Sequence, residues 1–175
     1  MPRIGMYCSR DILSDKQNDA VLAGVSAVCG EICALPLSKD EVPLAFDVLI
    51  IDEPHESVDL ALSVLSSNSF ILINSDRNIN IAIRRCPAHL ITYGLNQKAC
   101  ITASSITGDG LCGQMQVCIQ RGFPTSMGET AAVQEFPVHM HALGVDATIA
   151  LVGAMLVCGA KVREVEGVFG FAKLV

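Results

Sequence analysis

The chain of 175 residues is long enough for one compact domain with a well-developed core. Hydrophobic residues make up 51% and charged residues 17% of the sequence, which excludes a disordered acidic protein despite the net charge of -6. The same negative balance provides no basic surface for nucleic acid. Aromatic residues make up 5% and tryptophan is absent, so the core must consist of aliphatic side chains, as in a sheet covered by helices.

No segment predicts export or membrane insertion. The acidic residue Asp11 interrupts the N-terminal region, where a secretory signal needs an apolar stretch. The longest uncharged run, residues 147–160, is shorter than the roughly 20 residues of a membrane span and indicates a buried helix. We therefore expect a cytoplasmic protein that contacts no membrane, with its 8 cysteines reduced.

The first half of the chain alternates predicted strands with predicted helices. Val21, Val25 and Val28 recur at helical spacing after Ser14, a residue suited to cap a helix. A second helical stripe follows from Val58. The predicted strands are residues 3–8, 31–37, 46–51, 70–73 and 89–93. This alternation predicts an α/β fold with a mostly parallel, doubly wound sheet and right-handed crossovers.

The second half changes to consecutive strands. Turns at 108–110 and 127–129 separate predicted strands at 100–106, 114–120 and 131–138, which indicates a small three-stranded antiparallel sheet. Asp146 is suited to cap a C-terminal helix, and the last residues, 164–175, are predicted to form a strand or tail. We expect a single domain over 1–175, with a parallel α/β part (1–97), the small antiparallel sheet (98–140), and a helix and tail (141–175).

Several short stretches, taken in order, resemble one enzyme family. They are Ile71-Leu72-Ile73-Asn74-Ser75-Asp76, Ile91-Thr92-Tyr93-Gly94-Leu95, Ala99-Cys100-Ile101-Thr102-Ala103-Ser104-Ser105-Ile106, Asp146-Ala147-Thr148-Ile149-Ala150 and Glu166-Gly167-Val168-Phe169-Gly170-Phe171. Together they are similar to the central ATP-binding domain of the Mur ligases, which join amino acids to the peptidoglycan precursor. The resemblance spans residues 46–172. It implies a P-loop-NTPase-like fold of the Mur ligase central-domain type, a bacterial origin and a peptidoglycan-related ancestry.

The departures from that family bear on function. Where the ligases hold the ATP phosphates with Gly-x-x-Gly-Lys-Thr-Thr, this chain has Cys8-Ser9-Arg10-Asp11-Ile12-Leu13-Ser14. The chain also begins at the first strand and ends at the family's joint to its C-terminal domain, and it has no counterpart of the family's carbamoylated lysine. The resemblance therefore implies a truncated, degenerate domain without the P-loop and without complete ligase activity.

Acidic residues follow the predicted strand 46–51. The residues at this strand end are Asp52, Glu53 and His55. In open α/β sheets, ligands bind outside the carboxyl ends of parallel strands. Carboxylates at this position hold Mg²⁺ in P-loop enzymes. By resemblance, His55 and Asp59 correspond to part of the ligases' Asp-His-Leu-Asp stretch. The alternative interpretation, which we favour for Asp52 and Glu53, is that they cap the following helix, with Pro54 in its first turn.

The next strand end predicts a nucleotide contact. Asn74, Asp76 and Arg77 follow residues 70–73, and in the ligases the matching asparagine contacts adenine. The alternative is turn chemistry, because Asn and Asp bond to their own backbone in turns. Arg77, Arg84 and Arg85 form a local basic group that suits either an anion or a solvated helix face.

The histidines suggest a third possibility. His139 and His141 share one face of a strand by the period of two, and with Cys118 they could hold a metal ion. Packing within the small sheet is the interpretation we favour for them.

These observations predict a non-catalytic, degenerate domain that binds a partner protein or a small ligand. The alternative is a small enzyme or sensor that still binds ATP or ADP and Mg²⁺. High mean hydropathy, +0.46, further predicts a homo-oligomer.

Overall fold

A computed structural model describes residues 2–7, 14–35, 45–55, 58–79, 86–108 and 113–170. The segment 8–13, where the family's phosphate loop would lie, falls outside the described residues, as do Arg84, Arg85 and the centre of the predicted turn at 108–110.

One sheet of eight strands forms the frame of the protein, in the order β10-β7-β6-β5-β4-β3-β1-β2. The strands are β1 (Arg3–Tyr7), β2 (Glu31–Leu35), β3 (Val48–Ile51), β4 (Phe70–Asn74), β5 (His89–Tyr93), β6 (Ile101–Gly108), β7 (Gly113–Ile119) and β10 (Gln134–His139). Neighbouring strands from β2 to β6 are parallel, whereas β6, β7 and β10 pair antiparallel. A separate short pair joins β8 (Phe123–Pro124) to β9 (Thr130–Ala131).

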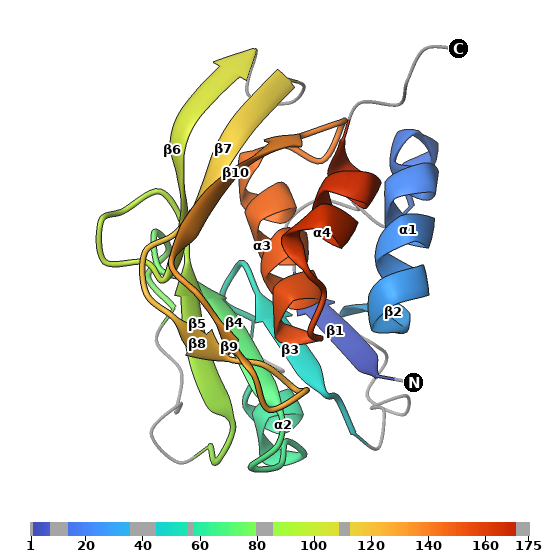
Figure 1. The fold of residues 1–175 in the computed structure, drawn as a ribbon. Coiled ribbons are helices and arrows are strands. Elements are labelled where there is room, and N and C mark those ends of the chain that lie inside the picture. The colour runs from blue at the N-terminus through green and yellow to red at the C-terminus, as the bar shows by residue number, and fades with distance from the viewer. Residues whose placement is uncertain are drawn as a thin grey trace.

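Helices cover both faces of the parallel part. The helices are α1 (Asp19–Cys29), α2 (Val58–Ser63), α3 (Val145–Val157) and α4 (Val162–Phe169). Figure 1 shows α1, α3 and α4 together on one face of the sheet, with α2 on the other. Because successive strand side chains point to opposite faces, Ile50 joins the cluster under α1 and α3, while Leu49 and Ile51 join the cluster under α2.

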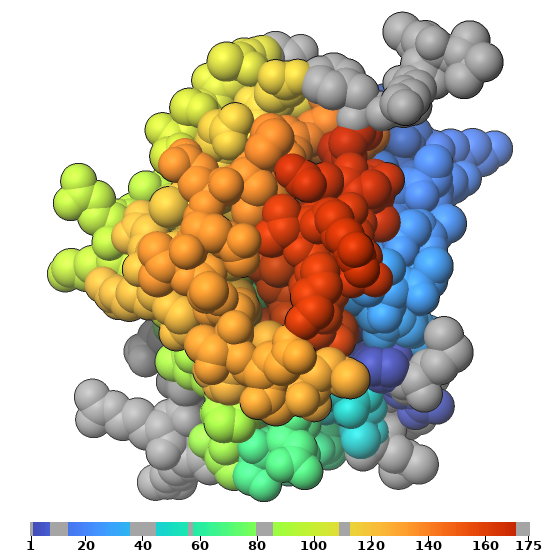
Figure 2. Space-filling view, in the orientation of Figure 1, coloured from blue at the N-terminus to red at the C-terminus, as the bar shows by residue number. Residues whose placement is uncertain are grey.

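The central helix of the fold is α3. Every residue from Ala147 to Val157 is buried, which explains why this run carries no charge. Figure 2 shows α4, in red, lying between the orange segment that precedes α3 and the blue helix α1, so that α3 is covered from this side. Among the described residues, no helix is long and apolar enough to cross a membrane.

The predicted α/β fold is confirmed, and the structure adds how its two kinds of strand are joined. The three antiparallel strands continue the parallel sheet, because Tyr93 of β5 pairs with Ile101 of β6. Apolar side chains of β7, such as Val117, then extend the same core cluster that lies under α3.

Two details at helix ends differ from the sequence prediction. Gly144, with φ of 78°, precedes α3, so Asp146 lies in the first turn instead of at the cap. A short 3-10 helix, Lys16–Asn18, precedes α1, and its N-cap is Asp15, whose Oδ1 accepts a hydrogen bond of 2.9 Å from Gln17 N; the N-cap of α1 itself is Asn18, four residues after Ser14.

The prediction of a strand or tail over 164–175 was wrong for the described part, which is the helix α4. Val165 and Phe169 are fully buried four residues apart, on one side of the helix. The four-residue spacing of Val165 and Phe169, with charged residues between them, is the pattern in the sequence that indicates a helix.

Candidate functional site

The order of the parallel strands reverses direction between β1 and β3. The chain passes from β1 outward to β2 and then returns to form β3 on the other side of β1. In open α/β sheets, ligands bind outside the carboxyl ends of the strands at such a reversal. Here β1 ends at Tyr7, and Asp52 follows β3 and donates its backbone N–H to Tyr7 O over 2.9 Å. Asp52 therefore lies at this reversal.

The side chain of Asp52 is the centre of a buried hydrogen-bond network. Its Oδ1 accepts one bond of 2.7 Å from Asn74 Nδ2 and another of 2.8 Å from the Tyr93 hydroxyl. Asp52 is 5% exposed, and Asn74 and Tyr93 are fully buried. The network ties together the carboxyl ends of β3, β4 and β5. The alternative interpretation of Asp52 as a helix cap stays a prediction, because residues 56–57, just before the first described residue of α2, lie outside the described part of the chain.

The predicted nucleotide residues form a turn with its own internal bonds. Asn74 Oδ1 accepts a 3.0 Å hydrogen bond from Asp76 N, as the turn interpretation predicts. The Asp76 carboxylate accepts hydrogen bonds from the backbone N–H of Leu95, from Asn96 N at 3.1 Å and from Asn96 Nδ2 at 2.7 Å. Asp76 thus holds the β5–β6 connection in place, and a side chain at Gly94, with φ of 141°, would collide with it.

Arg77 reaches the start of α3 on the same edge. Its Nη2 lies 3.2 Å from Asp146 Oδ2, and the two side chains are 46% and 32% exposed. Burial and the nearby charge of Asp52 raise the pKa of Asp146 above its ordinary value, and Arg77 partly opposes this shift. Asp76 also raises it. Among the described residues, the carboxylates of Asp52 and Asp76 and the guanidinium of Arg77 all act on Asp146, a mostly negative field that disfavours a free polyphosphate and favours hydrogen-bond donors.

The three residues predicted to bind a metal ion differ in burial and in their contacts. Asp52 belongs to the buried network, Glu53 is half-buried, and His55 is exposed with its ring stacked on Tyr7 at 5.5 Å between centroids. In the described part of the chain, no three His, Cys, Asp or Glu side chains are placed to hold a metal ion. Oδ1 of Asp52 already accepts hydrogen bonds from Asn74 and Tyr93. Only Oδ2 has no bond to these two donors. A Mg²⁺ ion shared with nucleotide phosphates needs few protein ligands, so this site stays a prediction.

The two histidines do meet, but not as neighbours on one strand face. His139 ends β10, and His141 lies beyond it with φ of 53°. Their rings are edge to face at 4.7 Å, and His141 N donates to His139 Nδ1 over 3.1 Å. The register places Cys118 opposite Glu135, four residues along β10 from His139, so the predicted metal trio does not form. Burial, and secondly the neighbouring His139, lower the pKa of His141.

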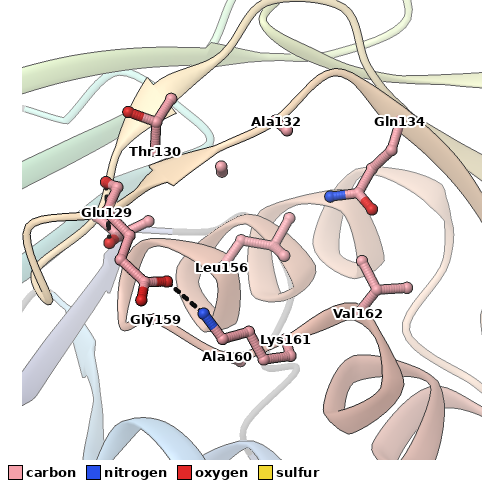
Figure 3. A pocket seen from close by; sticks show the side chains of 11 residues that line it. Glu129, Thr130, Ala132, Gln134, Leu156, Gly159, Ala160, Lys161 and Val162 are labelled. Atoms are coloured by element: carbon pink, nitrogen blue, oxygen red, sulfur yellow. Dashed lines mark hydrogen bonds and ion pairs between the residues drawn. The ribbon is translucent and has the colours of Figure 1, made fainter.

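A hollow lies away from the strand ends, at the other end of α3, and is shown in Figure 3. It encloses about 240 Å³ between the β8–β9 pair, the start of β10 and the α3–α4 corner. Leu156 forms its floor, and an ion pair between Glu129 and Lys161 stands at one side. Sequence reasoning missed this hollow, because Glu129 and Lys161 are distant in the chain and belong to no motif.

Sequence reasoning also missed Tyr93 and Asp146 as members of the strand-end site. Their positions in the sequence could have indicated this for Tyr93. Tyr93 ends a parallel strand, as Asn74 does, so both reach the same edge of the sheet.

Comparison with known proteins identifies the fold. The sequence matches no protein-family profile and no curated protein. Among solved structures, the fold is similar to a UDP-N-acetylmuramoylalanyl-D-glutamyl-2,6-diaminopimelate–D-alanyl-D-alanyl ligase from Acinetobacter baumannii, with a TM-score of 0.61 and 7% identity. Two further crystal structures of MurF from Acinetobacter baumannii give TM-scores of 0.60 and 0.63 at 9% and 10% identity.

These alignments cover 99% of this chain and 46% of each ligase chain. The chain therefore has a Mur-ligase-like α/β fold and spans about half the length of the ligases it matches.

Proposed function

We propose that this protein is a degenerate Mur-ligase-like domain that binds a small ligand or partner at the carboxyl ends of β3, β4 and β5 and does not carry out complete amino-acid ligation. The observation that supports this most is the buried network around Asp52. A carboxylate that two buried donors already hold is suited to shape a pocket floor more than to move with a cation during turnover.

The charge around the site supports the same proposal. The charges of Asp52 and Asp76 both raise the pKa of Asp146 at this edge of the sheet, and the chain has no Gly-x-x-Gly-Lys-Thr sequence to supply the backbone N–H groups and lysine that cradle phosphates. A ligand rich in hydroxyl or amine donors, such as a nucleoside or a sugar, suits this edge better than a free triphosphate. Localisation in the cytoplasm and self-association belong to the proposal and stay untested.

One observation favours a second candidate function. Arg77 is half-exposed beside the N-terminal turn of α3, and Asp52 lies where P-loop enzymes hold Mg²⁺. A small enzyme or sensor that binds ATP or ADP together with Mg²⁺ would use these groups.

A thermal-shift series distinguishes the two functions. Metal-free protein is heated with ATP, ADP, adenosine or UDP-sugars, each with and without Mg²⁺, because a ligand that binds the native state raises the melting temperature. We expect stabilisation by the adenosine or UDP-sugar class without a need for Mg²⁺, and a smaller shift in Arg77→Ala. The matched control is Arg163→Ala, an exposed arginine in α4 at the opposite end of α3, which should behave as wild type.

The opposite outcome has a clear signature. A shift that needs both an adenine nucleotide and Mg²⁺ and disappears in Asp52→Asn would replace our proposal by the nucleotide-dependent enzyme or sensor. No shift with any of these compounds would refute the small-ligand form of the proposal and leave a protein partner.

A further inference from the structure

The most exposed large apolar side chains of the described residues lie beside the hollow at the end of α3. Met127 is 72% exposed and Val133 is 66% exposed, whereas no other large apolar side chain in the described part exceeds 49%. A Cβ added to Gly159, which lines the hollow, would lie 2.4 Å from Met127 Cγ. Val133 stands between Ala132 and Gln134, which both line the hollow. One surface therefore combines a hollow with two protruding apolar side chains, a grouping that marks an interaction site.

Backbone hydrogen bonds fix the turn that carries Met127. Thr125 N donates to Glu129 O over 2.9 Å, which closes the turn. Ser126 N donates to Val157 O over 2.7 Å and so attaches the turn to the last residue of α3. Because the backbone on both sides of Met127 is already ordered, a contact made by this side chain costs little further conformational freedom.

The hollow itself suits an apolar side chain with charges around it. Its floor is Leu156, which is 3% exposed, and its volume is about 240 Å³. This is below the roughly 300–1,000 Å³ of pockets that hold drug-sized ligands. Glu129 and Lys161 form an ion pair at its side, with 62% and 57% of their side chains exposed (Figure 3). An exposed ion pair stabilises a monomer little, so both charges can also contact opposite charges on another molecule.

We propose that this surface is the interface of a two-fold symmetric dimer, in which Met127 of each copy enters the hollow of the second copy. A two-fold interface joins the same surface of both copies, so a protruding residue and the hollow that receives it must lie on one surface. Met127 and the hollow are adjacent, and a two-fold axis that passes between them fills both hollows. An unbranched, flexible methionine side chain suits such an irregular apolar space.

The charges support a second copy as the partner. Glu129 and Lys161 have opposite signs and stand on the same surface, so the two-fold axis brings Glu129 of each copy toward Lys161 of the second copy. Two chains that each have a net charge of -6 repel each other in general, and this pairing offsets the repulsion where they meet. An apolar centre with a charged rim is the usual composition of a protein interface.

The dimer specifies the self-association named in the proposed function and uses another surface than the ligand site at the strand ends. The two lie at opposite ends of α3, because Asp146 in its first turn contacts Arg77 and Leu156 in its last turn lines the hollow. Ligand binding and dimerisation can therefore be measured separately in the same protein.

The test is analytical ultracentrifugation over a range of protein concentrations. We expect a monomer–dimer equilibrium, and we expect Met127→Glu to weaken it at least about tenfold, because the variant would bury an unpaired charge in each hollow. The matched control is Leu60→Glu, which adds the same charge at a 48% exposed position of α2, on the other face of the sheet. Leu60→Glu should dimerise as wild type does.

A charge swap tests the rim of the interface. The double variant Glu129→Lys/Lys161→Glu has opposite charges within each chain and between two copies of itself, so it should form dimers. In a mixture with labelled wild type, like charges would meet across the interface. We therefore expect fewer mixed dimers than random pairing gives.

Three results would overturn the proposal. A protein that stays monomeric up to about 1 mM would leave this surface to a different protein. A dimer that Met127→Glu does not weaken would have its interface elsewhere, and random pairing in the charge-swap mixture would show that Glu129 and Lys161 do not face each other across the axis. Circular dichroism verifies that each variant is folded. Met127→Glu should retain the thermal shift with adenosine or UDP-sugars, so the loss of the dimer and a failure of the strand-end site are distinguishable.

Discussion

At the residue scale, the Tyr93 hydroxyl is the group whose removal tests the Asp52 network most directly. It donates a 2.8 Å hydrogen bond to a carboxylate that is 5% exposed. Tyr93→Phe keeps the ring but leaves that carboxylate with one donor fewer, and a lost bond to a buried charged group costs about 1.5–3 kcal/mol. We expect the free energy of unfolding in urea, followed by circular dichroism, to fall by that amount.

The control is Thr92→Val, at the neighbouring position of the same strand. Thr92 Oγ1 donates to the weak acceptor Cys100 Sγ at 3.5 Å and accepts a 3.1 Å bond from Cys100 N. Because that N–H also donates to Thr92 O over 2.9 Å, replacement of Thr92 should cost less than Tyr93→Phe. Equal stability of Tyr93→Phe and wild type would mean that the hydroxyl does not support the Asp52 carboxylate in solution.

At the element scale, two helical glycines are expected to respond in opposite directions to the same substitution. In α3, a Cβ at Gly153 would lie 2.5 Å from Leu72 Cδ2 and 3.0 Å from Ile101 Cδ1, both on fully buried residues of the sheet. In α4, a Cβ at Gly167 would meet nothing within 4 Å. Alanine forms helices better than glycine at both positions. The difference between the two substitutions in the free energy of unfolding therefore reports the packing around each added Cβ.

We expect Gly167→Ala to raise the free energy of unfolding by about 0.5–1 kcal/mol. Gly153→Ala should lower it by about 1–3 kcal/mol, because overpacking exceeds the helical gain. Urea denaturation of both variants provides the measurement. Stabilisation by Gly153→Ala would show that α3 lies farther from β4 than the structure has it.

At the scale of the whole molecule, the sheet and α3 join the described parts of three chain segments through a shared apolar cluster. The segments 1–97, 98–140 and 141–175, distinguished from sequence, contribute to one apolar cluster, which includes Ile50 of β3, Val117 of β7 and Ile149 of α3. Residues 1–97 alone would expose the face of β3 and β4 that α3 covers. We therefore expect these segments to unfold as one cooperative unit.

The two tyrosines allow this to be measured, since the chain has no tryptophan. Tyr7 belongs to the cluster under α2, and Tyr93 to the cluster under α3. Urea transitions followed by the fluorescence of Tyr7→Phe, which retains Tyr93, and by circular dichroism should coincide. A fragment of residues 1–97 should show no cooperative transition. Separate transitions, or a folded fragment, would indicate two independent units.

The sequence by itself determined the α/β class, the succession of most strands and helices along the chain, and the buried nature of the α3 segment. A short apolar run without alternation, as in residues 48–51, favours a strand buried on both faces, and the structure has this strand as β3. The stretches at 71–76, 91–95 and 99–106 likewise predicted the Mur-ligase-like fold, which the structural comparison confirms.

Only the tertiary structure decided how the polar residues are used. Asp52, Asn74 and Tyr93 are far apart in the chain, and the parallel register that brings them to one edge depends on pairing between strands, which local periodicity does not encode. The same holds for Arg77 with Asp146, whose contact follows from how α3 packs on the sheet. Each residue type was visible in the sequence, but its partner was set by packing.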